Sequence, residues 1–310
     1  PPAIVSMFLG EQLTNILEQI ENGDELAVTT NKKLRIGVST LPALPKDATD
    51  RNRTSPFAFT GNKFEFRMCP SSGSISGPNF VLNAIVAEFA DRLEKAHDVE
   101  AEVNDIIIET VKKHKRIIFN GNGYSEDWIE EAARRGLPNI TTTVESIKSL
   151  LDEKNIEVLE KHNVLTREEV HSRYEISLEN YSKTINIEAL TMIEMTKRDI
   201  LPAVISFAGK LAKGINEMKS TGLSLRLNCQ DELLEKVCIL TNSADEKVKV
   251  LENVLLKAEG IEESYEQAYA YKFEVVAAMD DLREDIDALE TVVGKEYWPL
   301  PTYTDLLFSV

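Results

Sequence analysis

The order of hydrophobic and polar residues predicts a short mixed segment at the start of the chain, followed by many helices. Residues 4–22 carry apolar side chains at three- and four-residue spacings, as an amphipathic helix does, and Asn22-Gly23 should end that helix. Residues 33–38 alternate and predict a short strand. Residues 41–45 contain two prolines and cannot form a central strand, because proline donates no backbone hydrogen bond.

A strong helical pattern returns at residues 79–96. Its apolar side chains fall on one side of the predicted helix: Val81, Leu82, Ile85, Val86, Phe89 and Leu93. Residues 69–78, which precede it, are dense in turn formers. The small side chains of this loop would let its backbone approach a ligand or another chain closely, and a bare surface loop is an equal alternative.

Acidic amphipathic helices dominate the chain from residue 99 onward. The shorter ones are predicted over residues 99–119, 126–135, 143–151 and 156–162. Thr166 precedes Glu169 by three residues, the order of a capping box, and should start a long helix that runs toward Met218. Pro202 should bend or divide that helix. With two further long helices, over residues 231–258 and 262–293, it predicts an antiparallel bundle.

The segment most suggestive of chemistry is residues 50–67. In a strand, successive side chains point to opposite faces, so Lys63, Glu65 and Arg67 share one face. The opposite face is apolar and carries Phe64, Phe66 and Met68. One face is therefore expected to be buried, while the other carries out chemistry or meets water.

Two interpretations of the charged face remain open. A carboxylate between two cations on a strand can be an ordinary surface ion-pair ladder. Two further cations, Arg51 and Arg53, precede the strand, and arginine is suited to a bidentate grip on phosphate or carboxylate. Together they describe an anion site that contains one acid, Glu65. An acid in such a site makes sense if it holds Mg²⁺, which takes carboxylate and phosphate oxygens together.

Composition limits the classes of partner. The 310 residues, 43% of them hydrophobic, are enough for two structural units. With 35 Lys and Arg against 52 Asp and Glu, the net charge of −17 disfavours nonspecific binding to nucleic acid or anionic membranes. The basic run at residues 112–116 is the local exception. A localisation or nucleic-acid patch is one interpretation, and a solvated helix end, where cations are favourable, is the preferred one.

Cysteine and histidine usage points to no metal or disulfide framework. The three cysteines show no metal-ligand spacing, and the four histidines form no ligand pattern. A reducing cytoplasm is therefore the expected compartment, and no apolar run reaches transmembrane length. The chain starts with Pro1 rather than Met, and its apolar start suggests the later part of a longer polypeptide.

At this point the residues resemble a known family. Arg51-Asn52-Arg53-Thr54, then Lys63-Phe64-Glu65-Phe66-Arg67, then Gly77-Pro78-Asn79-Phe80 resembles the late catalytic region of glutamine synthetase. Other segments are similar to the long type III enzymes of that family: residues 50–67, 1–6, 120–125, 180–186 and 298–303.

The resemblance implies an α+β fold: a remnant of the catalytic β-sheet domain followed by a large, mainly helical bundle region. Residues 1–95 would be the C-terminal part of the catalytic domain. Residues 96–295 would be the helical region with long antiparallel helices, and residues 296–310 a tail that docks on the folded body.

The resemblance also implies roles for individual residues. Glu65 would bind the divalent metal, and Arg67 would help fix the carboxylate of the substrate glutamate. Arg53 would stabilise the transferring phosphoryl group, and Lys63 would contact ATP phosphate where the family usually has arginine. Arg51 is a further, weaker candidate for binding ATP.

The implied reaction is the ATP-dependent ligation of ammonia to glutamate through a γ-glutamyl phosphate. The implied cofactors are ATP and Mg²⁺ or Mn²⁺. The implied partners are the substrates and further copies of the chain in a ring-based homo-oligomer, of which a dodecamer is one form. No nucleic acid and no membrane are expected.

Departures from the family bear on activity. Ala58 stands where the commoner enzymes place a second arginine, so one phosphate contact is missing or supplied from elsewhere. The other metal-binding carboxylates of the family fall before Pro1, so the chain should not turn over by itself. The alternatives are a related carboxylate-amine ligase that uses another amine, and a helical interaction module without catalysis.

Overall fold

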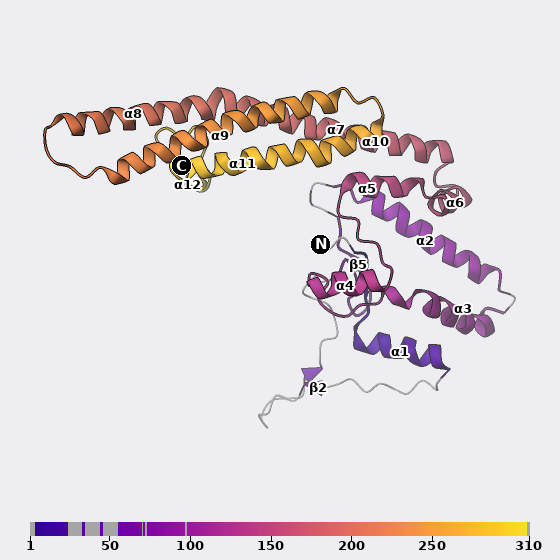
Figure 1. Cartoon of the computed structure of the whole chain (residues 1–310). Coiled ribbons are helices and arrows are strands. Elements are labelled where there is room, and N and C mark those ends of the chain that lie inside the picture. The colour runs from indigo at the N-terminus through magenta and orange to yellow at the C-terminus, as the bar shows by residue number, and fades with distance from the viewer. Residues whose placement is uncertain are drawn as a thin grey trace. The chain divides into compact units, whose positions relative to one another are not determined.

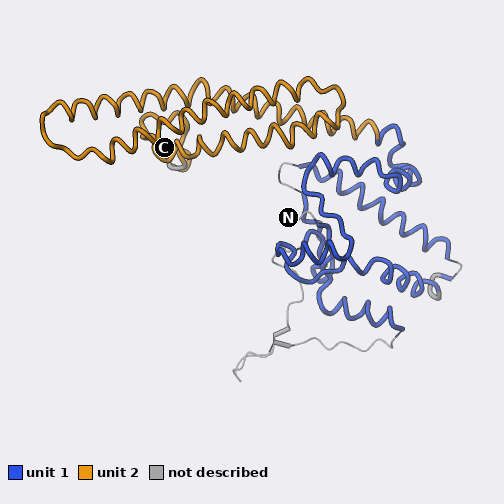
Figure 2. The backbone as a smooth tube through the Cα atoms, in the orientation of Figure 1, with its two compact units in different colours: residues 1–170 blue, residues 171–310 orange. Residues whose placement is uncertain are grey.

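The computed structural model describes residues 4–23, 33–34, 44–45, 55–69, 71, 73–96 and 98–308. The chain divides into two compact units, residues 1–170 and 171–310 (Figure 2). The described part is mostly helical and includes a small three-stranded sheet (Figure 1). Each unit has hydrophobic clusters of its own, so each is described by itself.

The sheet of unit 1 pairs a strand from the start of the chain with two strands about 50 residues later. Its order is β1 (Met7–Phe8), β4 (Phe57–Phe59), β5 (Phe64–Phe66), with β1 parallel to β4 and β4 antiparallel to β5. A separate two-stranded ribbon pairs β2 (Lys33–Leu34) with β3 (Leu44–Pro45). Proline is tolerated there because a two-stranded ribbon consists only of edge strands.

The first helix starts later than its sequence pattern predicts. Helix α1 spans Gly10–Asn22 and ends at Gly23, whose φ of 72° is the left-handed conformation expected of a helix stop. The predicted start near Ile4 is wrong. Met7 and Phe8 pair with β4 instead, and Ile4 is buried in a hydrophobic cluster. Tertiary pairing has overridden a local helical periodicity.

A distant side chain caps this helix. The Oδ1 atom of Asn120 accepts hydrogen bonds from the backbone N–H groups of Leu9, at 3.1 Å, and Gly10, at 2.9 Å. Its Nδ2 atom donates to the hydroxyl of Thr14 at 2.9 Å. Asn120 therefore satisfies backbone donors that a helix start leaves without partners.

Besides α1, the described part of unit 1 contains five α-helices and two 3₁₀ turns before the long helix α7 begins. They are α2 (Ser76–Glu94), α3 (Val99–His114) with a short 3₁₀ turn (Lys115–Ile117), α4 (Glu126–Arg134), α5 (Thr143–Lys148) with a second 3₁₀ turn (Ser149–Leu151), and α6 (Glu153–Lys161). The helix predicted to reach Phe119 stops early. Ile118 forms a β-bridge to Met7, and the N–H of Phe119 donates to the Met7 carbonyl at 3.0 Å.

The basic run at residues 112–116 occupies a helix end. Lys112, Lys113 and His114 form the last turn of α3, where the helix dipole favours cations. Lys115 pairs with Glu21 at 2.6 Å, and the Arg116 guanidinium donates to backbone carbonyls after α4. The preferred helix-end interpretation of this run is confirmed.

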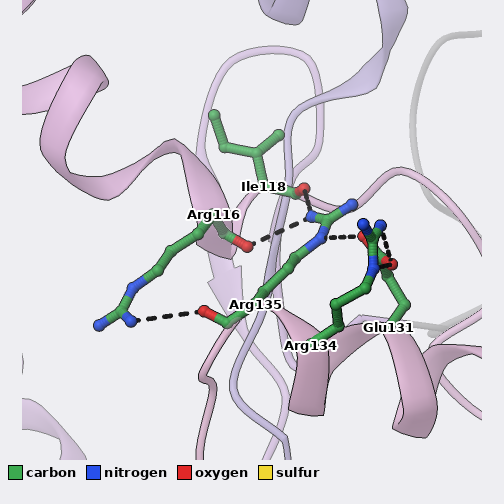
Figure 3. Close-up of polar contacts among 5 residues, drawn as sticks. All are labelled: Arg116, Ile118, Glu131, Arg134 and Arg135. Atoms are coloured by element: carbon green, nitrogen blue, oxygen red, sulfur yellow. Dashed lines mark hydrogen bonds and ion pairs between the residues drawn. The ribbon is translucent and has the colours of Figure 1, made fainter.

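Arg135, just after α4, ties the helix to the segment that follows α3 (Figure 3). Its Nη1 atom donates to the backbone carbonyls of Arg116, at 3.2 Å, and Ile118, at 2.9 Å. Its Nε atom bonds to Glu131, which also pairs with Arg134. The guanidinium thus satisfies carbonyls that the short 3₁₀ turn leaves without helical partners.

Two hydrophobic clusters hold unit 1 together. In one, Ile4, Trp128, Ala132 and Leu137 are buried, and the ring of Phe119 stacks on Trp128 with centroids 3.8 Å apart. The other joins α2 to α6 and to the first turn of α7 through Ala84, Ile156, Leu159 and Val170. These clusters explain why short helices with polar outer faces stay folded here.

The apolar side predicted for residues 79–96 does not contact this core. Helix α2 buries Ala84 and directs Phe80 against α6, whereas Val81, Ile85, Val86 and Phe89 are exposed. An exposed row of large apolar side chains on one helix face is uncommon for a monomeric domain. We call these four residues the open face of α2.

Unit 2 is a bundle of long helices. They are α7 (Arg167–Met195), which starts just before the unit boundary, α8 (Leu201–Ser220), α9 (Asn228–Glu259), α10 (Ser264–Ala270) and α11 (Val276–Glu290). Helix α9 packs along both α8 and α11. The capping box at the start of α7 is confirmed: Thr166 and Glu169 exchange hydrogen bonds of 3.2 and 2.8 Å.

Two wide π-helical turns interrupt these helices, at Thr196–Ile200 and Tyr271–Val275. The first lies directly before Pro202, where the sequence predicts a bend or a break. Proline has no N–H to donate to the carbonyl four residues earlier, and the π turn absorbs the disturbance without ending the helix. The second, at Tyr271–Val275, is not followed by a proline in its helix, so composition offers no signal for it.

The core of unit 2 joins the second half of α7 to α8, α9 and α11. Its fully buried members include Val237, Leu251, Val275, Leu282 and Leu289. The segment after α11 returns to this core: Trp298 is buried in it, and Tyr297 and Leu300 pack against it. A final short helix, α12, spans Tyr303–Leu307. Among the described residues, no helix is both long and apolar enough to cross a membrane.

Candidate active-site hairpin

Strands β4 and β5 form a tight hairpin that presents the charged residues singled out by the sequence. Ala58 stands opposite Glu65, and Phe57 opposite Phe66. The turn between the strands has a φ of 97° at Gly61, its first central position, as a type II′ turn requires. The N–H of Thr60 donates to the Lys63 carbonyl at 2.8 Å and closes the hairpin.

The predicted charged face of β5 is present. Lys63 Nζ lies 3.4 Å from Glu65 Oε1, and Arg67 donates to Glu65 Oε2 from Nε, at 3.3 Å, and Nη2, at 3.2 Å. On the other face, the rings of Phe57 and Phe64 stack with centroids 5.4 Å apart. The alternation expected of a strand is therefore confirmed for these three charged residues.

The two cations keep the acid ionised. The hydrogen bonds from Arg67, and then those from Lys63, hold the pKa of Glu65 below its ordinary value. The side chain of Glu65 is 39% exposed, whereas that of Arg67 is 13% exposed. The hairpin thus offers a carboxylate and an ammonium to solvent, with a guanidinium held closer to the protein.

Two other predicted site residues cannot be compared with this geometry. Arg51 and Arg53 lie outside the described residues, so the structure neither brings them to the hairpin nor separates them from it. Ala58, the position at which the commoner family members carry an arginine, is fully buried and paired with Glu65. No side chain at this position contributes a cation to the charged face.

The residues present fit a divalent metal only in part. A carboxylate that is partly open to solvent is a suitable ligand for Mg²⁺ or Mn²⁺. Within the part of the chain that the structure describes, no set of three metal ligands includes Glu65. Glu65 can therefore supply one ligand of a metal site. The other ligands of that site would have to come from residues that the structure does not describe or from further polypeptide.

Comparison with known proteins identifies the relationship. Residues 102–219 match the family described as the glutamine synthetase C-terminal domain. In sequence, this chain is a relative of glutamine synthetases. The family resemblance seen in its motifs is confirmed, and the match extends beyond those motifs.

Curated relatives align with the whole chain. A glutamine synthetase from Butyrivibrio fibrisolvens is 38% identical over 318 residues, covering 100% of this chain and 45% of the relative. A type-3 glutamine synthetase from Dictyostelium discoideum is 36% identical and covers 99% of this chain and 43% of the relative. A glutamine synthetase from Bacteroides fragilis is 32% identical, with 100% and 44% covered. The chain spans less than half the length of these glutamine synthetases.

Sequence spacing missed a second charged cluster in this glutamine synthetase relative. Glu88 and Asp91 of α2 lie beside Lys161 and His162, at the end of α6. No motif could reveal it, because more than 70 residues separate the two helices and only their packing brings the groups together. The weak signal was the spacing of Glu88 and Asp91, three residues apart on one helix face.

Proposed function

We propose that this chain forms the C-terminal part of a glutamate–ammonia ligase. In the reaction, the γ-carboxylate of glutamate attacks the terminal phosphorus of ATP and releases ADP, and ammonia then displaces phosphate from the γ-glutamyl phosphate. The glutamine synthetase relatives, similar along the whole chain, support this assignment. The observation that carries it is the hairpin face on which Lys63, Glu65 and Arg67 converge.

The roles proposed here are those that the family resemblance implies, and the charge and exposure of Lys63 and Arg67 agree with them. Lys63, the most exposed of the three, binds an ATP phosphate, and Arg67 holds the carboxylate of glutamate through its planar pair of donors. Arg53 stabilises the phosphoryl group during its transfer. Arg53 and Arg67 are the two residues for which we propose a catalytic role. Arg51 is a further ligand for ATP.

Glu65 is the metal ligand in this proposal. Because Arg67 and Lys63 keep it ionised, it can accept a hard cation without first losing a proton. A bound Mg²⁺ or Mn²⁺ would neutralise part of the phosphate charge. When phosphate oxygens are present, the two cations have other acceptors, and the carboxylate is free to turn toward the metal.

We further propose that residues 1–95 are the end of a catalytic domain, followed by the helical region over residues 96–295 and the tail over residues 296–310. The open face of α2 supports this division, since four large apolar side chains are exposed on it. Further polypeptide of a catalytic domain would cover such a face.

The proposal extends to assembly and compartment. The bundle of long helices suits the contacts of a ring-based homo-oligomer, as large helical surfaces commonly do. All three cysteines are free thiols, which agrees with a reaction in the reducing cytoplasm.

A chimeric enzyme tests the assignment. In it, this chain replaces the matching C-terminal part of the Butyrivibrio fibrisolvens relative, and glutamine formation is measured with ATP, ammonia and varied Mg²⁺. We expect Glu65→Gln to lower kcat/KM by at least about 100-fold, the size of effect seen when one charge-stabilising group is removed. The variant should also need more Mg²⁺ for half-maximal activity.

The matched control is Glu130→Gln, a carboxylate on the exposed surface of α4. It should retain the activity of the parent chimera. If the Glu65→Gln chimera is as active as the parent at every Mg²⁺ concentration, the proposed role of Glu65 is wrong, and so is the hairpin site.

A further inference from the structure

The cluster between α2 and α6 gathers three side chains that bind transition metals. One ligand atom each from Glu88, Asp91 and His162 lies within 4.8 Å of the other two. Nε2 of His162 is 3.0 Å from Oε2 of Glu88. The 3.0 Å spacing matches an edge of a coordination sphere whose metal–ligand distances are about 2.0–2.2 Å, and the carboxylate of Asp91 would have to draw closer to complete the sphere.

The cluster already holds one cation. Nζ of Lys161 lies 2.5 Å from Oε2 of Glu88 and 2.8 Å from Oδ2 of Asp91, so its ammonium binds both carboxylates at once. The hydrogen bond from Lys161, and then that from His162, lower the pKa of Glu88, and the Lys161 bond lowers that of Asp91. Two carboxylates that already share one positive partner could accept a metal cation in its place.

The fold adds to this attraction. Glu88 and Asp91 lie in the last two turns of α2, which ends at Glu94, and His162 caps the end of α6. The last turn of a helix carries partial negative charge, and Asp91 lies in that turn of α2 while His162 follows that of α6. Packing of Ala84 against Ile156 and Leu159 fixes the two helices against each other.

We infer that Glu88, Asp91 and His162 form a binding site for a divalent transition-metal ion of the Zn²⁺ class, for which the Lys161 ammonium is the competitor. An imidazole nitrogen beside carboxylate oxygens selects Zn²⁺, Co²⁺ or Ni²⁺ over Mg²⁺ and Ca²⁺. Three protein ligands leave a position for water. The bound ion ties the end of α2 to the end of α6.

Lys161 can give way because its side chain is 39% exposed and flexible, whereas that of His162 is 12% exposed. When the ion binds, the ammonium moves into water and the two carboxylates keep a positive partner. This site shares no residue with the hairpin site, and it does not depend on the proposed ligase activity.

Titration of the 310-residue chain with Co²⁺, followed by its visible absorption, and with Zn²⁺ by calorimetry tests the inference. We expect one ion per chain in the wild type, and binding at least about tenfold weaker in His162→Gln and in Asp91→Asn, since loss of a supporting group alone costs that much. Lys161→Met should bind about tenfold tighter, because the competing charge is gone.

Three controls make the result specific. Glu65→Gln, in the hairpin, and His114→Gln, an exposed histidine at the end of α3, should bind as the wild type does. Excess Mg²⁺ should not displace Co²⁺. Circular dichroism of each variant shows whether its helices have formed.

The inference is overturned if the wild type binds neither ion, even when Lys161→Met does, because the cluster is then only a salt bridge. It is also overturned if His162→Gln binds Co²⁺ as tightly as the wild type. Should His162→Gln fail to fold, Asp91→Asn and Lys161→Met decide: unchanged affinity in both refutes the site.

Discussion

Single residues decide how the loop after α3 is held. Phe119 stacks on Trp128, Asn120 caps α1, and Gly121 follows directly. A Cβ atom at Gly121 would lie 2.6 Å from Cζ of Phe119, closer than real side chains approach. The glycine is needed here for space, since its backbone is not in the left-handed region.

We therefore expect Gly121→Ala to lower the free energy of unfolding by about 1–3 kcal/mol, the usual cost of overpacking. Because the stacked Trp128 limits how far Phe119 can retreat, the clash cannot be relieved cheaply. Urea unfolding measures it, in a Trp298→Phe background so that the fluorescence of Trp128 reports on unit 1.

Gly77→Ala is the matched control. Gly77 lies in the first turn of α2, in the same unit, and a Cβ atom there meets nothing within 4 Å. Alanine should leave stability unchanged or raise it by up to about 1 kcal/mol, because it restricts the unfolded chain. Equal losses in both variants would contradict the steric role of Gly121.

The charged residues of the hairpin were predictable because their information is local. Alternation alone places Lys63, Glu65 and Arg67 on one face. The partner strand was not predictable in the same way: Phe57 and Ala58 pair with β1, about 50 residues earlier, and no short pattern records that. The cluster of Glu88 and His162 was not predictable either, because its members are also far apart in the sequence.

At the scale of helices, an ion pair with a buried carboxylate joins α9 to α11. Nζ of Lys247 lies 3.0 Å from Oδ1 of Asp285 and donates to the Asp281 carbonyl at 2.9 Å. Asp285 is 9% exposed, and its Oδ2 has no hydrogen-bond partner in the described structure. Within the described residues, Lys247 is therefore the cation that compensates this carboxylate.

Lys247→Met should lower the free energy of unfolding by about 1–3 kcal/mol, because it leaves a buried carboxylate without its cation. The double variant Lys247→Met, Asp285→Leu should recover most of that loss, since a well-packed apolar pair needs no compensation. Urea unfolding in a Trp128→Phe background measures it through Trp298, which is buried in the same bundle.

Lys249→Met is the control for that experiment. Lys249 also forms an ion pair, with Asp245 one turn before it on α9, but the side chains are 61% and 46% exposed. An exposed pair contributes at most about 0.5 kcal/mol. The interpretation is wrong if Lys247→Met lowers the free energy of unfolding no more than Lys249→Met does. In that case the ion pair does not compensate a buried charge on Asp285.

Helix ends were predicted well where a local signal exists and poorly where tertiary pairing decides. Gly23 and the capping box of Thr166 and Glu169 hold as expected. Helix α1 loses its first predicted turns to strand β1, and α3 gives up Ile118 and Phe119 to the same strand. In both places a strand pairing outweighs helical periodicity.

At the scale of the molecule, the sequence predicts a small sheet followed by a helical bundle, because long periodic stretches carry strong signals. The predicted domain boundary after residue 95 and the division of the structure after residue 170 concern different things. The first marks a family resemblance and stays a prediction. The second marks where compact packing changes, which composition does not encode.

The proposed assembly can be measured on the chimeric enzyme. We expect it to sediment as a ring-based oligomer, and the chimera that ends at residue 170 to sediment as smaller species. The reason is that unit 2 would offer a long helical surface for contacts between copies. A monomeric intact chimera, or a truncated chimera that assembles equally well, would count against a role of the bundle in assembly.

The cap that Asn120 provides for α1 has a consequence for synthesis on the ribosome. The capping side chain follows the helix start by 110 residues. At about 5–20 residues per second, the nascent helix waits roughly 5–20 s before its cap has been made. Closing so large a loop also costs chain entropy, so α1 should be among the last elements of unit 1 to become stable.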